Sequence, residues 1–322
     1  MKEITFIRNN YDKWQHLEEM LADVAAQSPA DLADMYVDLT ADLAFAQSHY
    51  PQSRITMYLN NLASTLHNEI YKNKHEKWSR LLTFWTREVP LTMYQERKML
   101  LISFLVVLGS ALIGVVSQLA DPEFVRVILG DNYVDMTLQN IEDGKPMDVY
   151  NGGKEINMFL GITLNNVWVS FQVFVLGIFT SIGTCWALFQ NGIMLGSFEA
   201  FFWQHDLLGE SLLAVFLHGT LEISAIVVAG AAGIALGNSW LFPGTYSRLV
   251  SFQRGAKRGL KIVVGTVPIF VVAGFIEGFL TRHTELNDLL RLAFILLSLA
   301  FVIFYFIVYP RKLHKELGLK QE

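Results

Sequence analysis

The sequence predicts an all-α fold: a polytopic membrane helix bundle of about six spans, preceded by an N-terminal cytoplasmic helical domain. Hydrophobic side chains make up 52% of the 322 residues and charged side chains only 17%, against about 25% charged in average soluble proteins. Close to half of the charge lies in residues 1–98, whereas residues 99–309 contain long uncharged runs. Runs of about 18 or more apolar residues are typical of transmembrane helices.

The composition also excludes several classes of protein. A net charge of −5 argues against a nucleic-acid binder, which usually presents a basic face. Cys185 is the single cysteine, so neither a disulfide framework within the chain nor a cysteine-built zinc site can form. The sequence has no G-x-G-x-x-G motif, P-loop or H-E-x-x-H motif, so no nucleotide site or metalloprotease is indicated.

Residues 1–98 are predicted to form the cytoplasmic helical domain. Apolar residues recur at helical spacing through Trp14, Leu17, Leu21 and onwards, and the segment contains no glycine, which suits helices rather than hairpins. Pro51 and Pro90 are expected to end helices. The first residues lack an apolar core, so no cleaved signal peptide is expected.

The transmembrane bundle is predicted over residues 99–310. Its six expected spans are about 99–120, 162–189, 191–205, 211–237, 260–281 and 289–309. The third would reach only ~22 Å at ~1.5 Å per residue, short of a ~30 Å hydrocarbon core. We therefore expect Asn191-Gly192 to separate two half-helices and the third span to be short or re-entrant.

Charges flanking the spans predict the orientation. Basic residues dominate before the first span, across 238–261 and in the basic tail 311–322, which are all expected in the cytoplasm. Acidic residues dominate the loop 121–155, which is expected outside. Both termini are then cytoplasmic, and the number of crossings is even.

Polar residues inside the spans form a candidate site. Its expected members are Glu199, His218, Glu222, Glu277, Asn165 and Asn166. Charged groups inside a membrane are costly and normally face a bundle interior or a cavity, and the predicted topology brings these residues to similar depth in the outer half. His218 and Glu222 are four residues apart and share a helix face.

Three interpretations of this polar cluster stay open. It could tie helices together through buried hydrogen bonds, without any cofactor. It could line a path for protons or a solute. His218, Glu222 and Glu277 could instead bind a divalent metal such as zinc, because imidazole and carboxylate are suitable ligands and two of them lie one turn apart.

A stripe of small residues is expected to mediate helix packing. Ala225, Ala229, Gly233 and Gly237 recur at a strict spacing of four, a pattern that lets helix backbones approach closely. The stripe predicts either packing within the chain or the seam of a homodimer.

These features together resemble the stage II sporulation protein M family of bacterial multipass membrane proteins. The matching stretches are Asn165-Asn166, Gly177, Gly183, Asn191-Gly192 with Gly196, HGTLE at 218–222, GAAGIALG at 230–237, Pro243-Gly244 and IEGF at 276–279. The stretches 41–51 and 58–71 also resemble the soluble part of non-sporulating members.

The resemblance implies a membrane scaffold and favours a protein that is not an enzyme. It would sit in the bacterial cytoplasmic membrane and organise envelope proteins in peptidoglycan remodelling, with peptidoglycan hydrolases or a MoxR-type ATPase system as partners. The family pattern supplies no catalytic residues. Two other functions stay open from the residues: a transporter or channel-like permease that uses the His/Glu cluster, and an intramembrane metal-dependent hydrolase.

Overall fold

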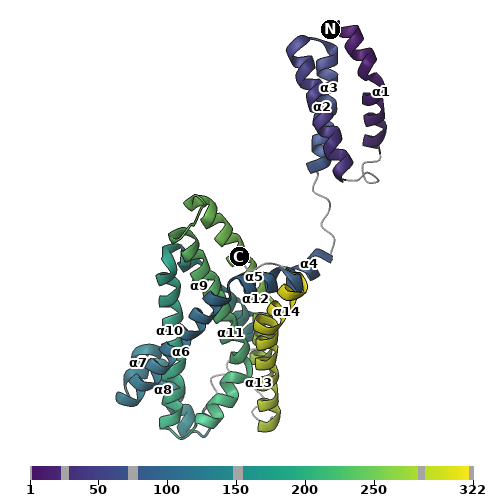
Figure 1. Cartoon of the computed structure of the whole chain (residues 1–322). Helices are drawn as coiled ribbons and strands as arrows, with labels where there is room; N and C mark the ends of the chain where they lie inside the picture. Colours follow the sequence, from purple (N-terminus) through teal and green to yellow (C-terminus); the bar gives the residue numbers. More distant parts are fainter. Residues whose placement is uncertain (1, 23–28, 72–78, 148–154, 282–286, 319–322) are drawn as a thin grey trace. The chain divides into compact units, whose positions relative to one another are not determined.

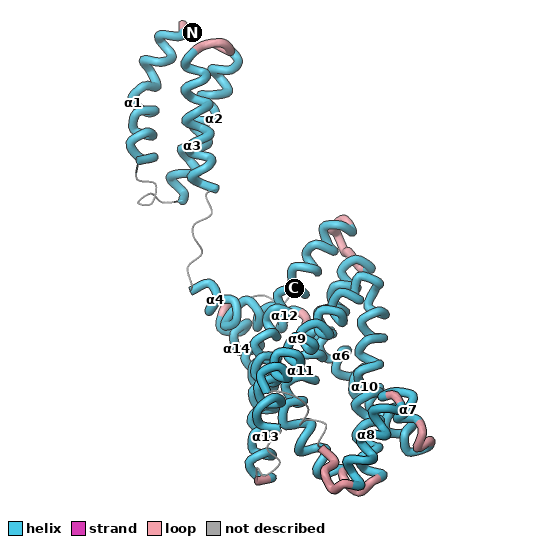
Figure 2. Tube along the Cα trace, turned by 180° about the vertical axis from the view of Figure 1, so that it is seen from behind, coloured by secondary structure: helices cyan, strands magenta, loops and turns pink. Residues whose placement is uncertain are grey.

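The computed structural model describes residues 2–22, 29–71, 79–147, 155–281 and 287–318, and every regular element within these ranges is a helix (Figures 1 and 2). The chain divides into two compact units, Met1–Trp78 and Ser79–Glu322. We call them unit 1 and unit 2. The division falls earlier than residue 98, because residues 79–98 pack with the apolar helices that follow them.

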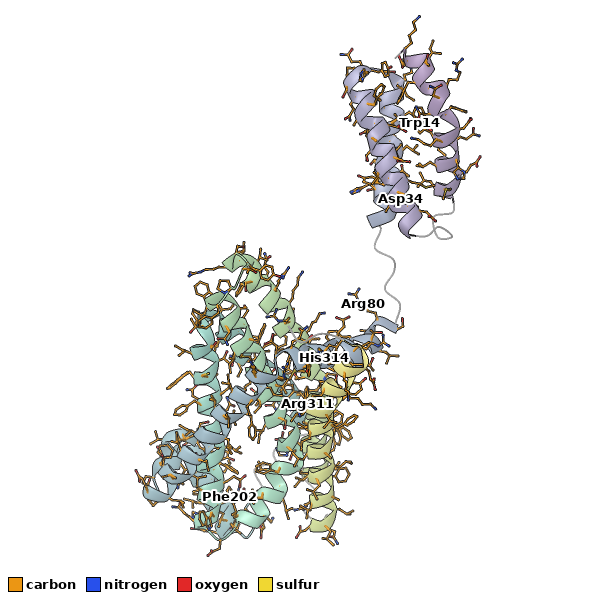
Figure 3. All side chains as sticks on the ribbon, in the orientation of Figure 1. Trp14, Asp34, Arg80, Phe202, Arg311 and His314 are labelled. Carbon is orange, nitrogen blue, oxygen red and sulfur yellow. The ribbon has the colours of Figure 1, made fainter. Side chains whose placement is uncertain are left out.

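Unit 1 is built from α1 (Glu3–Ala22), α2 (Pro29–His49) and α3 (Arg54–Tyr71). Trp14 on α1 lies at its centre with 1% of its surface exposed (Figure 3). Its indole ring contacts Tyr58 of α3, and its Nε1 donates a hydrogen bond of 2.9 Å to Asp42 of α2. One aromatic side chain therefore connects all three helices, while its only polar atom stays paired.

Unit 2 begins with three short elements, of which the second and third lie against the bundle. They are α4 (Ser79–Thr83), η2 (Phe84–Glu88) and α5 (Val89–Gln95). Val89 and Met93 are buried in the same apolar core as the long helices. Tyr305 donates a hydrogen bond of 2.7 Å to the carbonyl of Trp85, which also attaches this segment to the last long helix of unit 2.

Six long helices make up the body of unit 2. They are α6 (Arg97–Ala120), α9 (Glu155–Val175), α10 (Thr180–Gln204), α11 (Leu208–Leu241), α12 (Arg248–Phe275) and α13 (Asp288–Ile303). The turns η5 (Ile276–Thr281) and η6 (Phe304–Val308) continue the last two, and α14 (Tyr309–Glu316) follows η6. Five stretches within the described ranges are long and apolar enough to cross a membrane, and one of them, Met158–Gln204, contains most of α9 and all of α10.

The chain reverses between α9 and α10. The turn is η4 (Leu176–Phe179), followed by Thr180 with a φ of 67°. Thr184 donates a hydrogen bond of 2.9 Å to the carbonyl of Val173, although a continuous helix would hold these residues ~16 Å apart. Met158–Gln204 is therefore two antiparallel helices rather than one long span.

This reversal corrects the expected break at Asn191-Gly192. Both residues lie inside α10, where Asn191 donates a hydrogen bond to the carbonyl of Ala187 one turn earlier. Because α10 has 25 residues, it is ~37 Å long at ~1.5 Å per residue. The third long helix is thus neither short nor re-entrant, and six antiparallel helices fill the bundle.

Glycines set the spacing between α6 and α10. A Cβ built on Gly196 would lie 1.9 Å from the carbonyl oxygen of Ala111, and one on Gly192 would lie 1.9 Å from the Ser110 hydroxyl. From the other side, a Cβ on Gly114 would lie 2.4 Å from the carbonyl oxygen of Ile193. Backbones that approach this closely leave no room for any side chain, which is the small-residue packing typical of membrane helices.

Residues 121–147 form a folded cover rather than an open loop. It contains α7 (Phe124–Leu129) and α8 (Asp131–Glu142). Val125 and Val134 pack against Phe201 and Phe202 at the end of α10. The rest of the expected outside loop, residues 148–154, lies outside the described residues.

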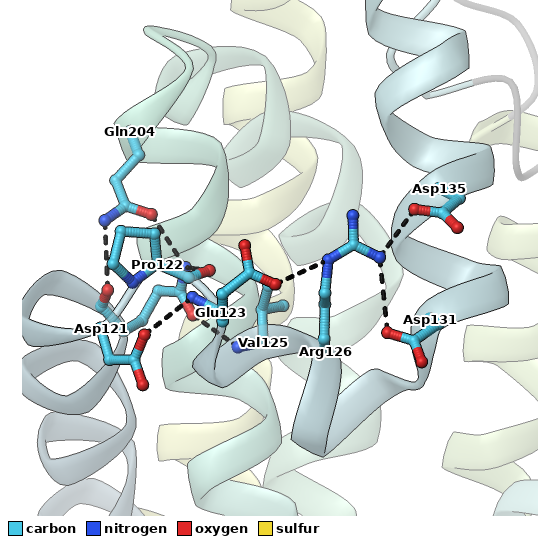
Figure 4. Close-up of polar contacts among 9 residues, drawn as sticks. Asp121, Pro122, Glu123, Val125, Arg126, Asp131, Asp135 and Gln204 are labelled. Atoms are coloured by element: carbon cyan, nitrogen blue, oxygen red, sulfur yellow. Dashed lines mark hydrogen bonds and ion pairs between the residues drawn. The ribbon is translucent and has the colours of Figure 1, made fainter.

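Polar contacts organise this cover (Figure 4). Arg126 pairs with Asp135 at 2.7 Å, Glu123 at 3.1 Å and Asp131 at 3.4 Å. The buried amide of Gln118 accepts a hydrogen bond of 2.7 Å from the Val125 amide and donates one of 2.8 Å to Gln204. Since Gln118 and Gln204 end α6 and α10, this network fixes the cover to the ends of both helices.

The antiparallel arrangement gathers opposite charges at the two ends of unit 2. The basic end contains Arg97, Lys98, Arg248, Arg254, Lys257, Arg311 and Lys312. Within it, Arg258 pairs with Glu96 at 2.7 Å, and Tyr94 stacks on His314 of α14. The acidic end carries α7 and α8 with Asp121, Glu123, Asp131, Asp135 and Glu142.

Candidate intramembrane polar site

Four of the predicted polar residues meet between three helices. His218 and Glu222 lie one turn apart on α11, Glu277 lies in η5, and Asn166 lies on α9. The Nε2 atom of His218 is 3.8 Å from Oε2 of Glu277. The Asn166 amide donates a hydrogen bond of 2.5 Å to Oε1 of Glu222. We call His218, Glu222, Glu277 and Asn166 the polar cluster.

The three acid–base side chains are close enough to share one ligand. One ligand atom from each of His218, Glu222 and Glu277 lies within 4.8 Å of the other two. His218 is 5% exposed, and 13% of the Glu277 side chain is exposed. The surroundings are apolar, with Leu217 and Leu221 from the same helix in the bundle core.

Local geometry explains how Glu277 and Asn166 reach α11. The π-helical turn η5 widens the end of α12 just where Glu277 occurs, and such turns change the direction of side chains and are frequent at functional sites. A Cβ on Gly274 would lie 2.2 Å from the Thr163 hydroxyl, so only glycine lets α9 approach here. That approach carries Asn166, one turn further along α9, to Glu222.

Thr281 completes the surroundings of His218, and the sequence reasoning did not find it. Its hydroxyl lies 3.3 Å from Nδ1 of His218 and the side chain is 6% exposed. The available signal was its spacing of four residues from Glu277 near the end of a span. That signal is weak, because a threonine at a span end is common.

Glu199 and Asn165 do not join the polar cluster. Glu199 lies on α10, where Oε2 accepts a hydrogen bond of 2.9 Å from Ser211. Asn165 is exposed on the outer side of α9. Similar depth in the bundle was therefore not enough to bring residues together, because depth does not specify which way each helix turns its side chains.

The family model of stage II sporulation protein M, SpoIIM, matches residues 102–282, which is more than half of the chain. The chain belongs to the SpoIIM family. A second model, a domain of unknown function (DUF8413), matches residues 4–72. No curated protein matches the chain, and no solved structure does.

The SpoIIM match confirms the resemblance predicted from the sequence and covers every residue of the polar cluster. It extends from the start of α6 to the end of η5, so α13 and α14 lie beyond it. The match to the domain of unknown function covers most of unit 1. Unit 1 and unit 2 thus match separate family models.

The small-residue stripe of this SpoIIM-family chain is buried inside unit 2. Ala225 and Ala229 are fully buried. A Cβ on Gly233 would lie 2.4 Å from the Thr184 hydroxyl, and one on Gly237 would lie 2.3 Å from the Ser181 amide nitrogen. Gly233 and Gly237 therefore pack against the α9–α10 reversal, whereas Ala225 and Ala229 belong to the apolar core that includes α12. The described stripe is thus buried within its own chain.

Proposed function

We propose that this SpoIIM-family protein is a scaffold of the bacterial cytoplasmic membrane that organises partner proteins in cell-envelope or peptidoglycan remodelling. The observation that best supports this proposal is the backbone-to-backbone packing of helices in unit 2. Glycines hold α10 against α6 and the α9–α10 reversal against α11, with backbone directly against backbone at Gly114, Gly196 and Gly177. Such contacts favour one rigid arrangement, because close-packed protein interiors have low compressibility.

The charge distribution supports an orientation for the scaffold. Basic residues collect on the cytoplasmic side of membrane proteins, so the basic end of unit 2 would face the cytoplasm. The acidic end, with its folded cover of α7 and α8, would face outwards. Unit 2 starts at Ser79 on the basic end, and α14 also lies there. Both termini would therefore be cytoplasmic.

The two soluble surfaces would then serve different partners. Unit 1 would dock cytoplasmic proteins, of which a MoxR-type ATPase is the class that the family resemblance implies. It exposes several large apolar side chains, Ile4 at 80%, Val37 at 64% and Met57 at 69%. The cover of α7 and α8 would face outer partners such as peptidoglycan hydrolases.

Site-directed photo-crosslinking in intact cells tests this proposal. A photoreactive amino acid at Val37 or Met57 should give adducts with one defined cytoplasmic protein. The matched control is the same amino acid at Leu101 on α6, an exposed position inside a span, which should give lipid adducts only. Equal, unselective adducts at all three positions would contradict a docking role for unit 1.

A permease is the second candidate, because the polar cluster places ionisable groups inside the bundle. The two functions differ in membrane conductance. Proteoliposomes containing the full chain should hold a pH gradient as well as empty vesicles if the protein is a scaffold. A proton leak that disappears in Glu222→Gln would instead support the permease.

A further inference from the structure

We propose that His218, Glu222 and Glu277 bind one divalent metal ion, with zinc as the preferred ion. The proposal rests on the geometry of these three side chains and is independent of the scaffold role. It assigns one nitrogen and two oxygen ligands from two separate elements, α11 and η5. Zinc accepts this ligand set, and three protein ligands leave a fourth position in a tetrahedral site.

The distances suit shared ligands better than a direct pair. At 3.8 Å, Nε2 of His218 and Oε2 of Glu277 are too far apart for a hydrogen bond. Two ligand atoms at 2.0–2.1 Å from one tetrahedral zinc ion lie about 3.3 Å from each other. All three ligand atoms already lie within 4.8 Å of one another, so small torsional changes in the long glutamate side chains would close the site.

The neighbouring residues form the outer contacts that metal ligands usually have. The Asn166 amide donates to Oε1 of Glu222, which orients that carboxylate. The Thr281 hydroxyl lies against Nδ1 of His218, which leaves Nε2 directed at Glu277. Ligating imidazoles and carboxylates are typically held by second hydrogen bonds of this kind.

A bound cation would also offset the electrostatic cost of placing two carboxylates in this site. Two carboxylates in apolar surroundings repel each other, and an isolated buried charge is strongly unfavourable. A divalent ion neutralises both at once without requiring either side chain to turn towards lipid. Glu199 is also a buried carboxylate, but it lies on another helix, where Oε2 accepts a hydrogen bond from Ser211 and Oε1 has no partner among the described residues. It therefore serves as an internal comparison.

The test is metal loading of the purified full chain in lipid nanodiscs. After chelator treatment and re-addition of Zn²⁺, elemental analysis should find about one zinc ion per chain, as expected for a single three-ligand site. Glu222→Gln and Glu277→Gln should each lose the bound zinc. The matched control Glu199→Gln, also a buried carboxylate changed to an amide, should keep it.

Variants that leave all three ligands in place keep the test decisive if a ligand variant fails to fold. Asn166→Ala and Thr281→Val each remove one outer hydrogen bond and should weaken zinc affinity about 10–100-fold. Co²⁺ loading should give visible absorption bands of tetrahedral cobalt that are lost in Glu277→Gln. A folded wild-type chain that binds no Zn²⁺, or zinc that stays bound in all cluster variants, would overturn the proposal.

Discussion

Adding a single methyl group at Gly196 should force α6 and α10 apart. The Gly196→Ala change places a Cβ 1.9 Å from the carbonyl oxygen of Ala111, 2.7 Å from its carbonyl carbon and 3.0 Å from its Cα. Carbon–oxygen contacts of this type normally lie at about 3.3–3.6 Å. The helices must therefore separate by roughly 1.4 Å or more at this point, because the obstacle is backbone and cannot rotate away.

The expected loss of stability follows from two opposing effects. Overpacking a tight interface costs about 1–3 kcal/mol. Alanine favours the helix over glycine by up to about 1 kcal/mol, which offsets part of that cost. We expect Gly196→Ala to lower the free energy of unfolding by about 1–2 kcal/mol. The separation would also loosen the neighbouring approach of Gly114 to Ile193.

The assay is unfolding by SDS titration from mixed micelles, followed by far-UV circular dichroism. The matched control is Gly109→Ala on α6, where an added Cβ has nothing within 4 Å. It makes the same chemical change without the clash and should leave stability unchanged or slightly raised. If Gly196→Ala unfolds at the same SDS fraction as Gly109→Ala, the tight contact between α6 and α10 does not exist.

Three further predictions use the same physical reasoning. Gly233→Leu should lower the amount of folded protein, because the leucine side chain would enter the α9–α10 reversal. Size-exclusion chromatography measures both the folded fraction and the oligomeric state. A folded protein changed only in oligomeric state would contradict this prediction. In a Cys185→Ser background, intact cells treated with an impermeant thiol reagent should label Asp143→Cys but not Val250→Cys; the reverse pattern would invert the proposed orientation. Burial, and then a hydrogen bond with Glu18, raise the pKa of Tyr58 to about 12. The contribution of the protonated Tyr58 hydroxyl to folding stability is complete below the unfolded pKa of ~10 and is lost as pH rises through ~12. Tyr58→Phe should therefore make the unfolding of unit 1 less sensitive to pH in that window. Circular dichroism as a function of pH measures this.

Part of the polar cluster could be predicted from spacing alone. His218 and Glu222 share a face because the helix repeat places residues four apart on one side. Glu277 and Asn166 could be placed only at a similar depth. Their meeting with α11 depends on the π-helical turn η5 and on the close approach at Gly274, neither of which has a reliable sequence signal. Glu199 shows the consequence, since it shares the acidic half of the bundle but binds Ser211 instead.

The existence of the apolar helices was determined by the sequence itself. Charged side chains cannot remain in hydrocarbon at low cost, so the long uncharged runs identify the apolar segments without any knowledge of their packing. The family resemblance was equally readable, because the HGTLE and IEGF stretches occur as short continuous motifs. Both inferences depend on local composition.

The division of those segments into helices was decided only by the tertiary structure. Residues 156–198 carry no charge, so hydropathy does not locate the reversal, and Asn191-Gly192 is a stronger turn signal than the actual turn at Thr180. The reversal forms there because Gly177 and Gly233 let two backbones meet and Thr184 bonds back to Val173. Local composition sets which residues leave water, whereas the fit between distant backbones sets where the chain turns.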